Sequence, residues 1–272
     1  MLKVRQLIGT HDVLFMTFDT LRYDVAHNCL EEGRTPFLKS ILPGQRWENR
    51  HSPGTFTFAA HQAFFAGFLP TPVAPGPHPR LFAGRFFGSE TTNENTFVYD
   101  APTWIEGLKQ VGYHTICIGG VGFFNQRTAL GRVLPDLFDE AHWSEDMGVT
   151  SPTSTQSQVS LAIDRLSQHS AEQRIVLFIN ISAIHQPNRF YLPGASVDDL
   201  RSHGAALEYV DRSLPPLFEA LRSRGPSLCL LCSDHGTAYG EDGYQGHRLA
   251  HPVVWEVPYA EFVADSTPKG TP

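Results

Sequence analysis

Residues that could perform chemistry follow the most apolar short segment near the C-terminal end of this 272-residue chain. The apolar segment 227–232 leads directly into Ser233, Asp234, His235 and Gly236. A run of this length and composition predicts a buried strand of a parallel sheet. In α/β proteins, ligands collect where such strands end. The adjacent carboxylate and imidazole could therefore bind a divalent cation, although an isolated Asp-His pair more often caps a turn.

Two other predicted strands also end in polar side chains. Asp19 follows the apolar segment 13–18, and its carboxylate is either a metal-ligand candidate or the N-cap of a helix. The segment 175–181 is the strongest strand prediction in the chain; it contains Asn180 near its end and is followed by His185. We expect these groups to gather at the carboxyl edge of one sheet.

Two threonines lie where turn residues give way to a small, apolar helical segment that ends at Gly67. Thr55 and Thr57 therefore stand at or near a helix N-terminus. The helix dipole and the free N–H groups at such a position favour anions and developing alkoxide charge. A threonine there is more often a simple N-cap, so this position alone does not establish a function.

The order of the remaining elements predicts one three-layer α/β domain over residues 1–264, with a largely parallel sheet. We expect a further strand at 115–118 and an edge-type strand at 257–263, because Pro258 removes one ladder donor. Helices are predicted at 35–42, 103–111, 154–169 and 201–223, the last broken or kinked at Pro215-Pro216. The Pro- and Gly-rich segment 71–88 is expected to be a surface loop, either a lid or a pocket wall. Residues 265–272 are expected to be a disordered tail.

Composition excludes several classes of protein. A net charge of −7 with no basic block argues against a nucleic-acid or membrane-surface binder. No apolar run approaches the roughly 20 residues that span a bilayer. Four cysteines agree with a reducing compartment, and a first strand at Val13 leaves no room for a signal peptide, so we expect a cytoplasmic protein. The 13 histidines must be mostly structural or superficial, and His142 and His169 belong to no motif.

Taken in order, these motifs resemble the alkaline phosphatase superfamily, in its sulfatase-like branch. Each motif is weak by itself, but the ordered set is fairly specific to the superfamily and covers most of residues 12–260. The matching pieces are Phe18 to Asp24, Thr57 ten residues before Gly67, Leu69-Pro70, Ile179 to Pro187, Ser233 to Gly236, Gly240-Glu241, Gly246-His247 and Val257-Pro258.

The resemblance implies a metal centre and a nucleophile. Asp19, Asp234 and His235 correspond to ligands of the activating metal, and Thr57 corresponds to the nucleophile, with Thr55 as the fallback. A threonine hydroxyl is a poor nucleophile until a cation stabilises its alkoxide, so the residue types agree with that assignment. The reaction would pass through a phosphothreonine that water then attacks. Mixed oxygen and nitrogen ligands favour Mn²⁺ or Zn²⁺, with Mg²⁺ also compatible.

A second group of residues has two possible roles. Asn180, His185 and His247 occupy positions that hold a second metal in two-metal relatives, but an asparagine in place of aspartate removes a charge and weakens such a site. The two histidines could instead donate hydrogen bonds to the phosphate and the leaving oxygen, and both readings remain open. His251 is a further candidate for that role. His61, one turn beyond Thr57, either contacts substrate or packs within its helix.

The sequence departs from the sulfatases at the nucleophile. Sulfatases use a formylglycine made from Cys or Ser, followed by an arginine four residues later, whereas this chain has Thr57 and His61. Threonine cannot become formylglycine, so we expect a phosphoric ester hydrolase that acts on a small-molecule phosphomonoester or phosphodiester. The alternatives are a phosphomutase or phosphotransferase on the same scaffold, a sulfuric ester hydrolase, and a non-catalytic binding protein.

Overall fold

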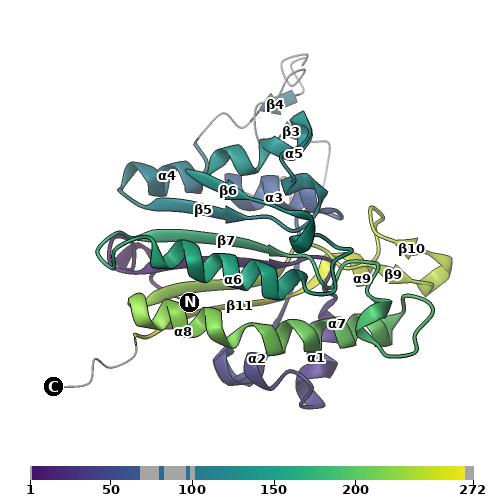
Figure 1. The fold of residues 1–272 in the computed structure, drawn as a ribbon. Helices are drawn as coiled ribbons and strands as arrows, with labels where there is room; N and C mark the ends of the chain where they lie inside the picture. The colour runs from purple at the N-terminus through teal and green to yellow at the C-terminus, as the bar shows by residue number, and fades with distance from the viewer. Residues whose placement is uncertain (1, 68–79, 83–95, 99–101, 267–272) are drawn as a thin grey trace.

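The computed structural model describes residues 2–67, 80–82, 96–98 and 102–266 (Figure 1). A seven-stranded sheet forms its centre, and six of these strands run in one direction, while β11 is antiparallel to both of its neighbours. The order across the sheet is β2 (Glu48–His51), β11 (Glu256–Ala264), β8 (Ser227–Ser233), β1 (Asp12–Phe18), β7 (Ile175–Ile181), β5 (His114–Ile118) and β6 (Glu140–His142). The prediction of a largely parallel sheet is confirmed.

Strand β1 shows why the fold has three layers. All seven of its residues are buried, and successive side chains enter different cores because a strand alternates its faces. Leu14, Met16 and Phe18 belong to one hydrophobic core, whereas Val13 and Phe15 belong to the other. A sheet that is apolar on both faces must be covered on both faces.

Helices supply the two outer layers (Figure 1). The helices on one face are α1 (Tyr23–Glu31), α2 (Pro36–Ile41), α6 (Ser154–Ser167), α7 (Leu200–Ser213) and α8 (Pro215–Arg224). Those on the other are α3 (Thr57–Ala66), α4 (Trp104–Gln110) and α5 (Ala129–Val133). The predicted three-layer α/β/α sandwich is confirmed.

Shorter elements connect these layers. Beyond β8 the chain forms β9 (Ala238–Tyr239), β10 (Gln245–Gly246) and α9 (Pro252–Trp255), and β3 (Arg80–Phe82) pairs with β4 (Thr96–Val98). Single 3₁₀ turns lie at Val4–Gln6, Pro43–Gln45, Gly122–Phe124, Pro135–Leu137, Glu145–Met147, Arg189–Tyr191 and Glu241–Gly243.

The structure corrects two sequence predictions. The strand predicted at 257–263 is not an edge strand, because β2 pairs with β11 and lies outside it. Pro258 is tolerated because the pairing of β11 with β8 begins only at Tyr259. The strand β6 was not predicted; it has only three residues and a polar composition. The loop predicted at 71–88 lies outside the described residues except for β3.

One aromatic side chain fastens α3 to the sheet. Phe178 of β7 is fully buried, and its ring centroid lies 5.2 Å from that of Phe65 in α3 and 5.6 Å from that of Phe15 in β1. Edge-to-face and tilted aromatic pairs at these distances add to the hydrophobic stabilisation. The position of α3 therefore depends on this ring.

Truncation of Phe178 should destabilise the protein markedly. We expect Phe178→Ala to lower the free energy of unfolding by about 3–5 kcal/mol, because the change leaves a cavity among packed rings. Leu130→Ala is the control, since Leu130 is 49% exposed, and it should change that energy by no more than about 0.5 kcal/mol. Urea denaturation of both variants measures the difference, and equal losses would contradict the assigned role of Phe178.

Candidate functional site

The pairing of two parallel strands brings the predicted metal ligands together. Phe18 of β1 lies opposite Ser233 of β8, so Asp19 and Asp234 leave the sheet side by side. The Ser233 hydroxyl lies 2.7 Å from the carbonyl oxygen of Phe18 and 2.8 Å from that of His235, and it can donate to either. The strand ends are thus tied at the point where the polar residues begin.

One oxygen of the Asp234 carboxylate accepts hydrogen bonds, and the other accepts none from the described residues. Its Oδ1 accepts hydrogen bonds from the backbone N–H groups of Thr20, at 3.3 Å, and of His235, at 3.0 Å. Thr20 has φ of +63°, a left-handed conformation that costs energy for a β-branched residue. The buried Oδ2 makes no hydrogen bond to any described residue.

Asp19 shows the same arrangement. Its Oδ2 accepts hydrogen bonds from Thr57 Oγ1, at 3.2 Å, and from the side-chain amide of Asn180, at 3.4 Å. Its Oδ1 is buried and makes no hydrogen bond within the described part of the chain. A buried carboxylate oxygen with no partner is costly, so two of them together indicate a site built for a cation.

His235 supplies the nitrogen of this group. Its Nδ1 lies 2.9 Å from the carbonyl oxygen of Gly236, which can only accept, so Nδ1 carries the proton. The deprotonated Nε2 then faces Thr57 Oγ1 at 3.3 Å. One ligand atom each from Asp19, Asp234 and His235 lies within 4.8 Å of the others, and all three residues are fully buried. Two carboxylate oxygens and an imidazole nitrogen fit a divalent transition metal.

Thr57 is the threonine that reaches the cluster. It is the first residue of α3, it is buried, and its hydroxyl contacts Asp19 and His235 as described above. The carbonyl oxygen of Thr55 accepts from the N–H of Arg248 at 2.8 Å. The geometry thus favours Thr57 over Thr55 as the reactive hydroxyl, at a helix N-terminus that favours negative charge.

Burial sets the electrostatics of the cluster. Desolvation raises the pKa of Asp19 to about 6, with the charge of Asp234 as the second cause. Desolvation likewise raises the pKa of Asp234 to about 7 and lowers the pKa of His235. Two buried carboxylates side by side repel each other and lose hydration, and a divalent cation would offset both costs.

Asn180 lies beside Asp19, with its amide oriented by the backbone. Its Oδ1 accepts from the N–H of Val121 at 3.1 Å, so its Nδ2 must be the atom that faces Asp19 and Thr17. An amide nitrogen cannot ligate a metal. In this orientation Asn180 holds Asp19 in place, and the geometry favours that role over a second metal site.

His61 lies in the interior of the protein, and its Nδ1 is 3.8 Å from Asp234 Oδ2. Its Nδ1 is 2.7 Å from the carbonyl oxygen of Thr57, and its Nε2 is 3.0 Å from Thr17 Oγ1. Four phenylalanine rings surround it, and burial lowers its pKa to about 3, so it is neutral. Both ring nitrogens are engaged within the protein, which favours the reading that His61 packs in its helix.

Two further histidines stand next to His235. The ring centroid of His247 lies 4.6 Å from that of His235 and 5.6 Å from that of His185. The Nδ1 of His185 donates to the carbonyl oxygen of Gln186. Burial, followed by the neighbouring imidazoles, lowers the pKa of His247 to about 3, so its ring is neutral. The structure therefore gathers these two predicted residues at the site.

His251 is engaged in local structure. Its Nδ1 accepts from the N–H of Val253 at 3.3 Å as the N-cap of α9, and its Nε2 donates to Asp242 at 3.1 Å. This leaves neither ring nitrogen for the phosphate-binding role that the sequence suggested.

Arg22 is a positioning residue to which the sequence analysis assigned no role. It is only 3% exposed, and its guanidinium forms ion pairs with Asp24 and Glu241 and donates to the carbonyl oxygen of Thr237 at 3.4 Å. It thereby joins the loop after β1 to the loop after β8. The sequence signal that could have indicated this role is an arginine three residues after the metal-ligand candidate Asp19.

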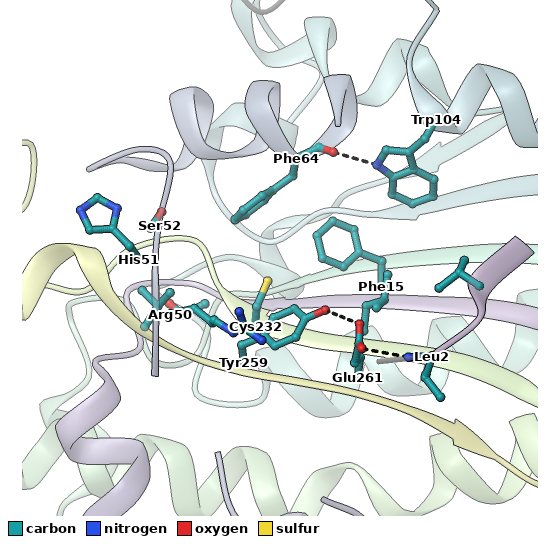
Figure 2. Close-up of a pocket in the computed structure, with 14 residues that line it drawn as sticks. Leu2, Phe15, Arg50, His51, Ser52, Phe64, Trp104, Cys232, Tyr259 and Glu261 are labelled. Carbon is teal, nitrogen blue, oxygen red and sulfur yellow. Dashed lines mark hydrogen bonds between the residues drawn. The ribbon is translucent and has the colours of Figure 1, made fainter. Parts of the chain in front are cut away.

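An apolar pocket of 590 Å³ lies over the face of the sheet (Figure 2). Phe15, Phe64 and Trp104 form part of its wall, and the indole of Trp104 donates to the carbonyl oxygen of Phe64 at 2.8 Å. Ser52, which lines the pocket, also donates to the backbone carbonyl of Asp234. The residues that line this pocket do not include Asp19, Thr57, Asp234 or His235, so the pocket is separate from the candidate metal centre.

Comparison with known proteins identifies the fold. No protein-family model and no curated protein matches the sequence. The C-terminal periplasmic domain of phosphoethanolamine transferase EptC from Campylobacter jejuni aligns with a TM-score of 0.64 and 15% identity over 94% of this chain and 80% of that chain. A protein in the alkaline phosphatase superfamily from Vibrio parahaemolyticus aligns with a TM-score of 0.58 and 16% identity over 95% and 61%. This chain has the alkaline phosphatase superfamily fold.

A third structure of this fold contains zinc and is a periplasmic domain. The periplasmic domain of EcEptC from Escherichia coli, in complex with Zn, aligns with a TM-score of 0.63 and 13% identity over 93% of this chain and 73% of that chain. The prediction of a cytoplasmic protein is contradicted, because these neighbours are periplasmic domains. In the part of the chain that the structure describes, no helix has the length and apolar character that a bilayer crossing needs.

A glycine next to the cluster allows a close approach of two backbones. The N–H of Gly236 donates to the carbonyl oxygen of Val254 at 2.7 Å, and a Cβ at Gly236 would lie 2.0 Å from the carbonyl oxygen of Val253. We expect Gly236→Ala to displace α9 and lower the free energy of unfolding by about 1–3 kcal/mol. Gly107→Ala, with open space around its Cβ in α4, should raise that energy by up to about 1 kcal/mol. Denaturation curves that rank the two variants the other way would contradict this packing.

The buried carboxylates should give the metal-free protein a characteristic pH dependence. Their pKa values are higher in the folded than in the unfolded chain, so their contribution to stability is present below pH 4 and is lost as the pH rises through 6 and 7. We expect a loss on the order of 3 kcal/mol over this range in EDTA, which added Mn²⁺ or Zn²⁺ offsets. Asp234→Asn should reduce the loss, whereas the exposed control Asp136→Asn should not. A pH-independent stability in EDTA would contradict this account.

Proposed function

We propose that this protein is a metal-dependent enzyme that cleaves phosphoric esters with Thr57 as its nucleophile. The observation that carries the proposal is the contact of one buried threonine hydroxyl with Asp19 and His235, beside two carboxylate oxygens that lack hydrogen bonds. A hydroxyl at a helix N-terminus, surrounded by metal-ligand types, is the arrangement that nucleophilic catalysis at phosphorus requires.

Asp19, Asp234 and His235 would hold the cation. Thr57 Oγ1, which contacts Asp19 and His235, would lie next to it. When bound, a divalent cation lowers the pKa of a hydroxyl and neutralises charge on the phosphoryl oxygens. The chain contributes the geometry: Ser233 and Thr20 fix the strand ends, and Asn180 holds Asp19. Metal ligands that are fixed in this way do not have to reorganise during the reaction.

The reaction proceeds in two displacements at phosphorus. The oxygen of Thr57 forms a bond to phosphorus as the bond to the leaving oxygen breaks, which gives a phosphothreonine ester and a released alcohol. An acceptor hydroxyl then attacks the same phosphorus and frees Thr57. The N-terminus of α3 favours the negative charge in both steps. His247, whose ring lies beside that of His235, donates a ring N–H to the phosphate or to the leaving oxygen. The Nδ1 proton of His185 is already directed at the carbonyl oxygen of Gln186, so its Nε2 accepts a hydrogen bond there.

The acceptor in the second step is water in a hydrolase and another alcohol in a transferase. Hydrolysis is the first candidate, because it needs only water as the acceptor. Transfer is the second candidate, because the Campylobacter jejuni neighbour is a phosphoethanolamine transferase that shares the fold over most of both chains. We also infer a periplasmic or extracellular location from these neighbours. Sulfate ester hydrolysis is disfavoured, since Thr57 cannot form formylglycine and His61 replaces the arginine of sulfatases.

Hydrolysis of a panel of chromogenic esters tests the nucleophile. The panel contains p-nitrophenyl phosphate, its bis-ester, a phosphonate ester and the sulfate, each with Mn²⁺ or Zn²⁺ added. We expect metal-dependent turnover of a phosphorus ester that Thr57→Ala reduces by roughly 10³-fold or more. Thr57→Ser should keep activity within roughly tenfold, because it preserves the hydroxyl.

Thr55→Ala is the matched control and should remain active. Activity that survives Thr57→Ala, or a preference for the sulfate, would contradict the mechanism. Adding glycerol to the assay separates the two candidate functions, since a transferase forms glycerol phosphate in proportion to glycerol while a hydrolase releases inorganic phosphate. Phosphorus NMR of the products distinguishes these results.

A further inference from the structure

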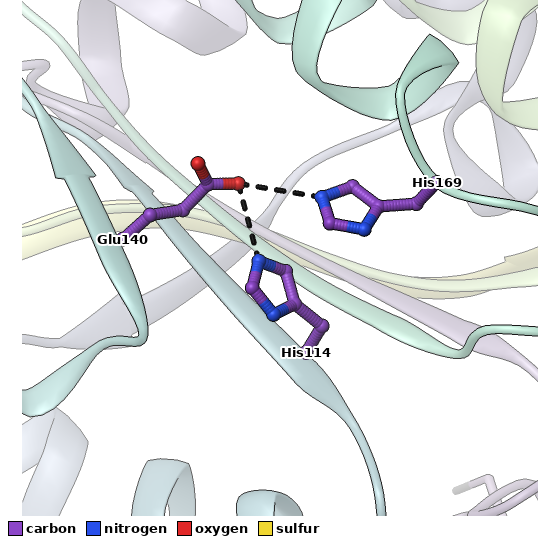
Figure 3. A group of neighbouring side chains, drawn as sticks. All are labelled: His114, Glu140 and His169. Carbon is purple, nitrogen blue, oxygen red and sulfur yellow. Dashed lines mark hydrogen bonds and ion pairs between the residues drawn. The ribbon is translucent and has the colours of Figure 1, made fainter.

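A second group of metal-ligand side chains lies at the opposite edge of the sheet and is independent of the proposed function. His114 begins β5, Glu140 begins β6, and His169 follows the end of α6. The cluster therefore lies at the amino ends of parallel strands, whereas the candidate metal centre lies at their carboxyl ends. Figure 3 shows one oxygen of Glu140 directed at both imidazoles.

We propose that His114, Glu140 and His169 form a zinc site that fastens β5 and β6 to the end of α6. Two imidazole nitrogens and one carboxylate oxygen are a common set of protein ligands for Zn²⁺, with water in the fourth position. The three ligand atoms lie within 4.8 Å of one another, and the side chains are 18–29% exposed, which leaves room for that water.

Two of the three distances between the ligand atoms agree with tetrahedral coordination, and the third lies within 4.8 Å. Glu140 Oε1 lies 3.2 Å from His114 Nε2 and 3.5 Å from His169 Nε2. Ligands at ordinary zinc distances, placed at the corners of a tetrahedron, are separated by about 3.4 Å. A cation could therefore enter with little movement of these side chains.

The surroundings provide the outer partners that metal ligands require. The second oxygen of Glu140 is held by Arg165, at 2.7 Å, and by His142, at 3.1 Å, which leaves Oε1 for the metal. On the far side of the His114 ring, Nδ1 faces the Asp139 carboxylate at 3.8 Å. A ligating histidine whose other nitrogen faces a carboxylate is the usual arrangement at zinc.

The backbone of each ligand is already fixed. The N–H of His114 donates to the carbonyl of Arg174 at 2.9 Å, and Glu140 lies in register with Ile116 of β5. The carbonyl of His169 accepts from the guanidinium of Arg224 at 2.7 Å. Little chain entropy is therefore lost when a metal binds.

An ordinary ion-pair cluster is the competing explanation. In such a cluster each imidazole would make its own hydrogen bond to the carboxylate. His114 does so, at 3.2 Å, but His169 Nε2 is buried and makes no hydrogen bond to any described residue, although it faces the same oxygen. A cation bound to both atoms would give this nitrogen the partner that it lacks, because their separation is that of two corners of a tetrahedron.

Zinc stoichiometry in the 272-residue chain tests the proposal. Equilibrium dialysis against Zn²⁺ followed by elemental analysis gives the bound equivalents for wild type, His169→Gln, His114→Gln and the control His27→Gln. Each of the first two variants should bind one equivalent fewer than wild type, and the control should bind as much as wild type. Asp234→Asn alters only the candidate metal centre, so it should still bind the equivalent of Zn²⁺ that His169→Gln loses. Loss of zinc from one site is therefore distinguishable from loss at the other.

Thermal unfolding provides the second readout. In the Asp234→Asn background, Zn²⁺ at a hundred times its Kd should raise the melting temperature on the order of 5 °C. Adding His169→Gln or His114→Gln to that background should abolish the rise, whereas adding His27→Gln should not. Unchanged zinc stoichiometry in both ligand variants would show an ion-pair cluster only and would overturn the proposal.

Discussion

The structure depends on the parallel pairing of β1 with β8, which brings two acidic residues together in the interior. Hydrogen bonds along the strands set the register of Phe18 against Ser233, and that register leaves Asp19 beside Asp234. Without a cation, these two carboxylates are buried at a cost that shows in their raised pKa values. Packing of both sheet faces supplies the stability that offsets this cost.

The same constraint accounts for the conformation of the surrounding segments. The left-handed backbone of Thr20 directs its N–H at Asp234, and Arg22 joins the loops that follow the two strands. The phenylalanine cluster around Phe178 fixes α3, whose first residue is Thr57. The loops after β1 and β8 and the start of α3 therefore meet at the Thr57 hydroxyl. Contacts outside the cluster hold these segments in place.

The sequence predicted the strands that carry the site, because their apolar runs end abruptly in Asp19, Asn180 and Asp234. The resemblance to the alkaline phosphatase superfamily, in which the spacing to Gly67 is one matching feature, indicated Thr57 as the nucleophile. The sequence could not predict the orientation of the Asn180 amide, because that depends on the N–H of Val121, a residue 59 positions away. His61 remained ambiguous for the same reason, since only the packed structure shows both of its ring nitrogens engaged.

Elements with weak local patterns were missed or misplaced. The strand β6 has three residues and no apolar alternation, so neither it nor the position of Glu140 could be inferred. The prediction for β11 failed because Pro258 indicates an edge only at its own position, while the rest of the strand pairs with β8. The predicted cytoplasmic location rested on the cysteine content and on the position of the first strand, and it was contradicted by structures of the same fold.

Anomalous diffraction from crystals grown with Mn²⁺ tests the central claim most directly. The claim is that the unpartnered oxygens of Asp19 and Asp234 exist to bind a cation next to Thr57. The account predicts an anomalous peak in contact with both carboxylates, His235 Nε2 and Thr57 Oγ1. An absence of a peak at that position, in crystals saturated with the metal, would contradict it. A peak that contacts the carboxylates but not Thr57 would contradict the assignment of Thr57 as the nucleophile.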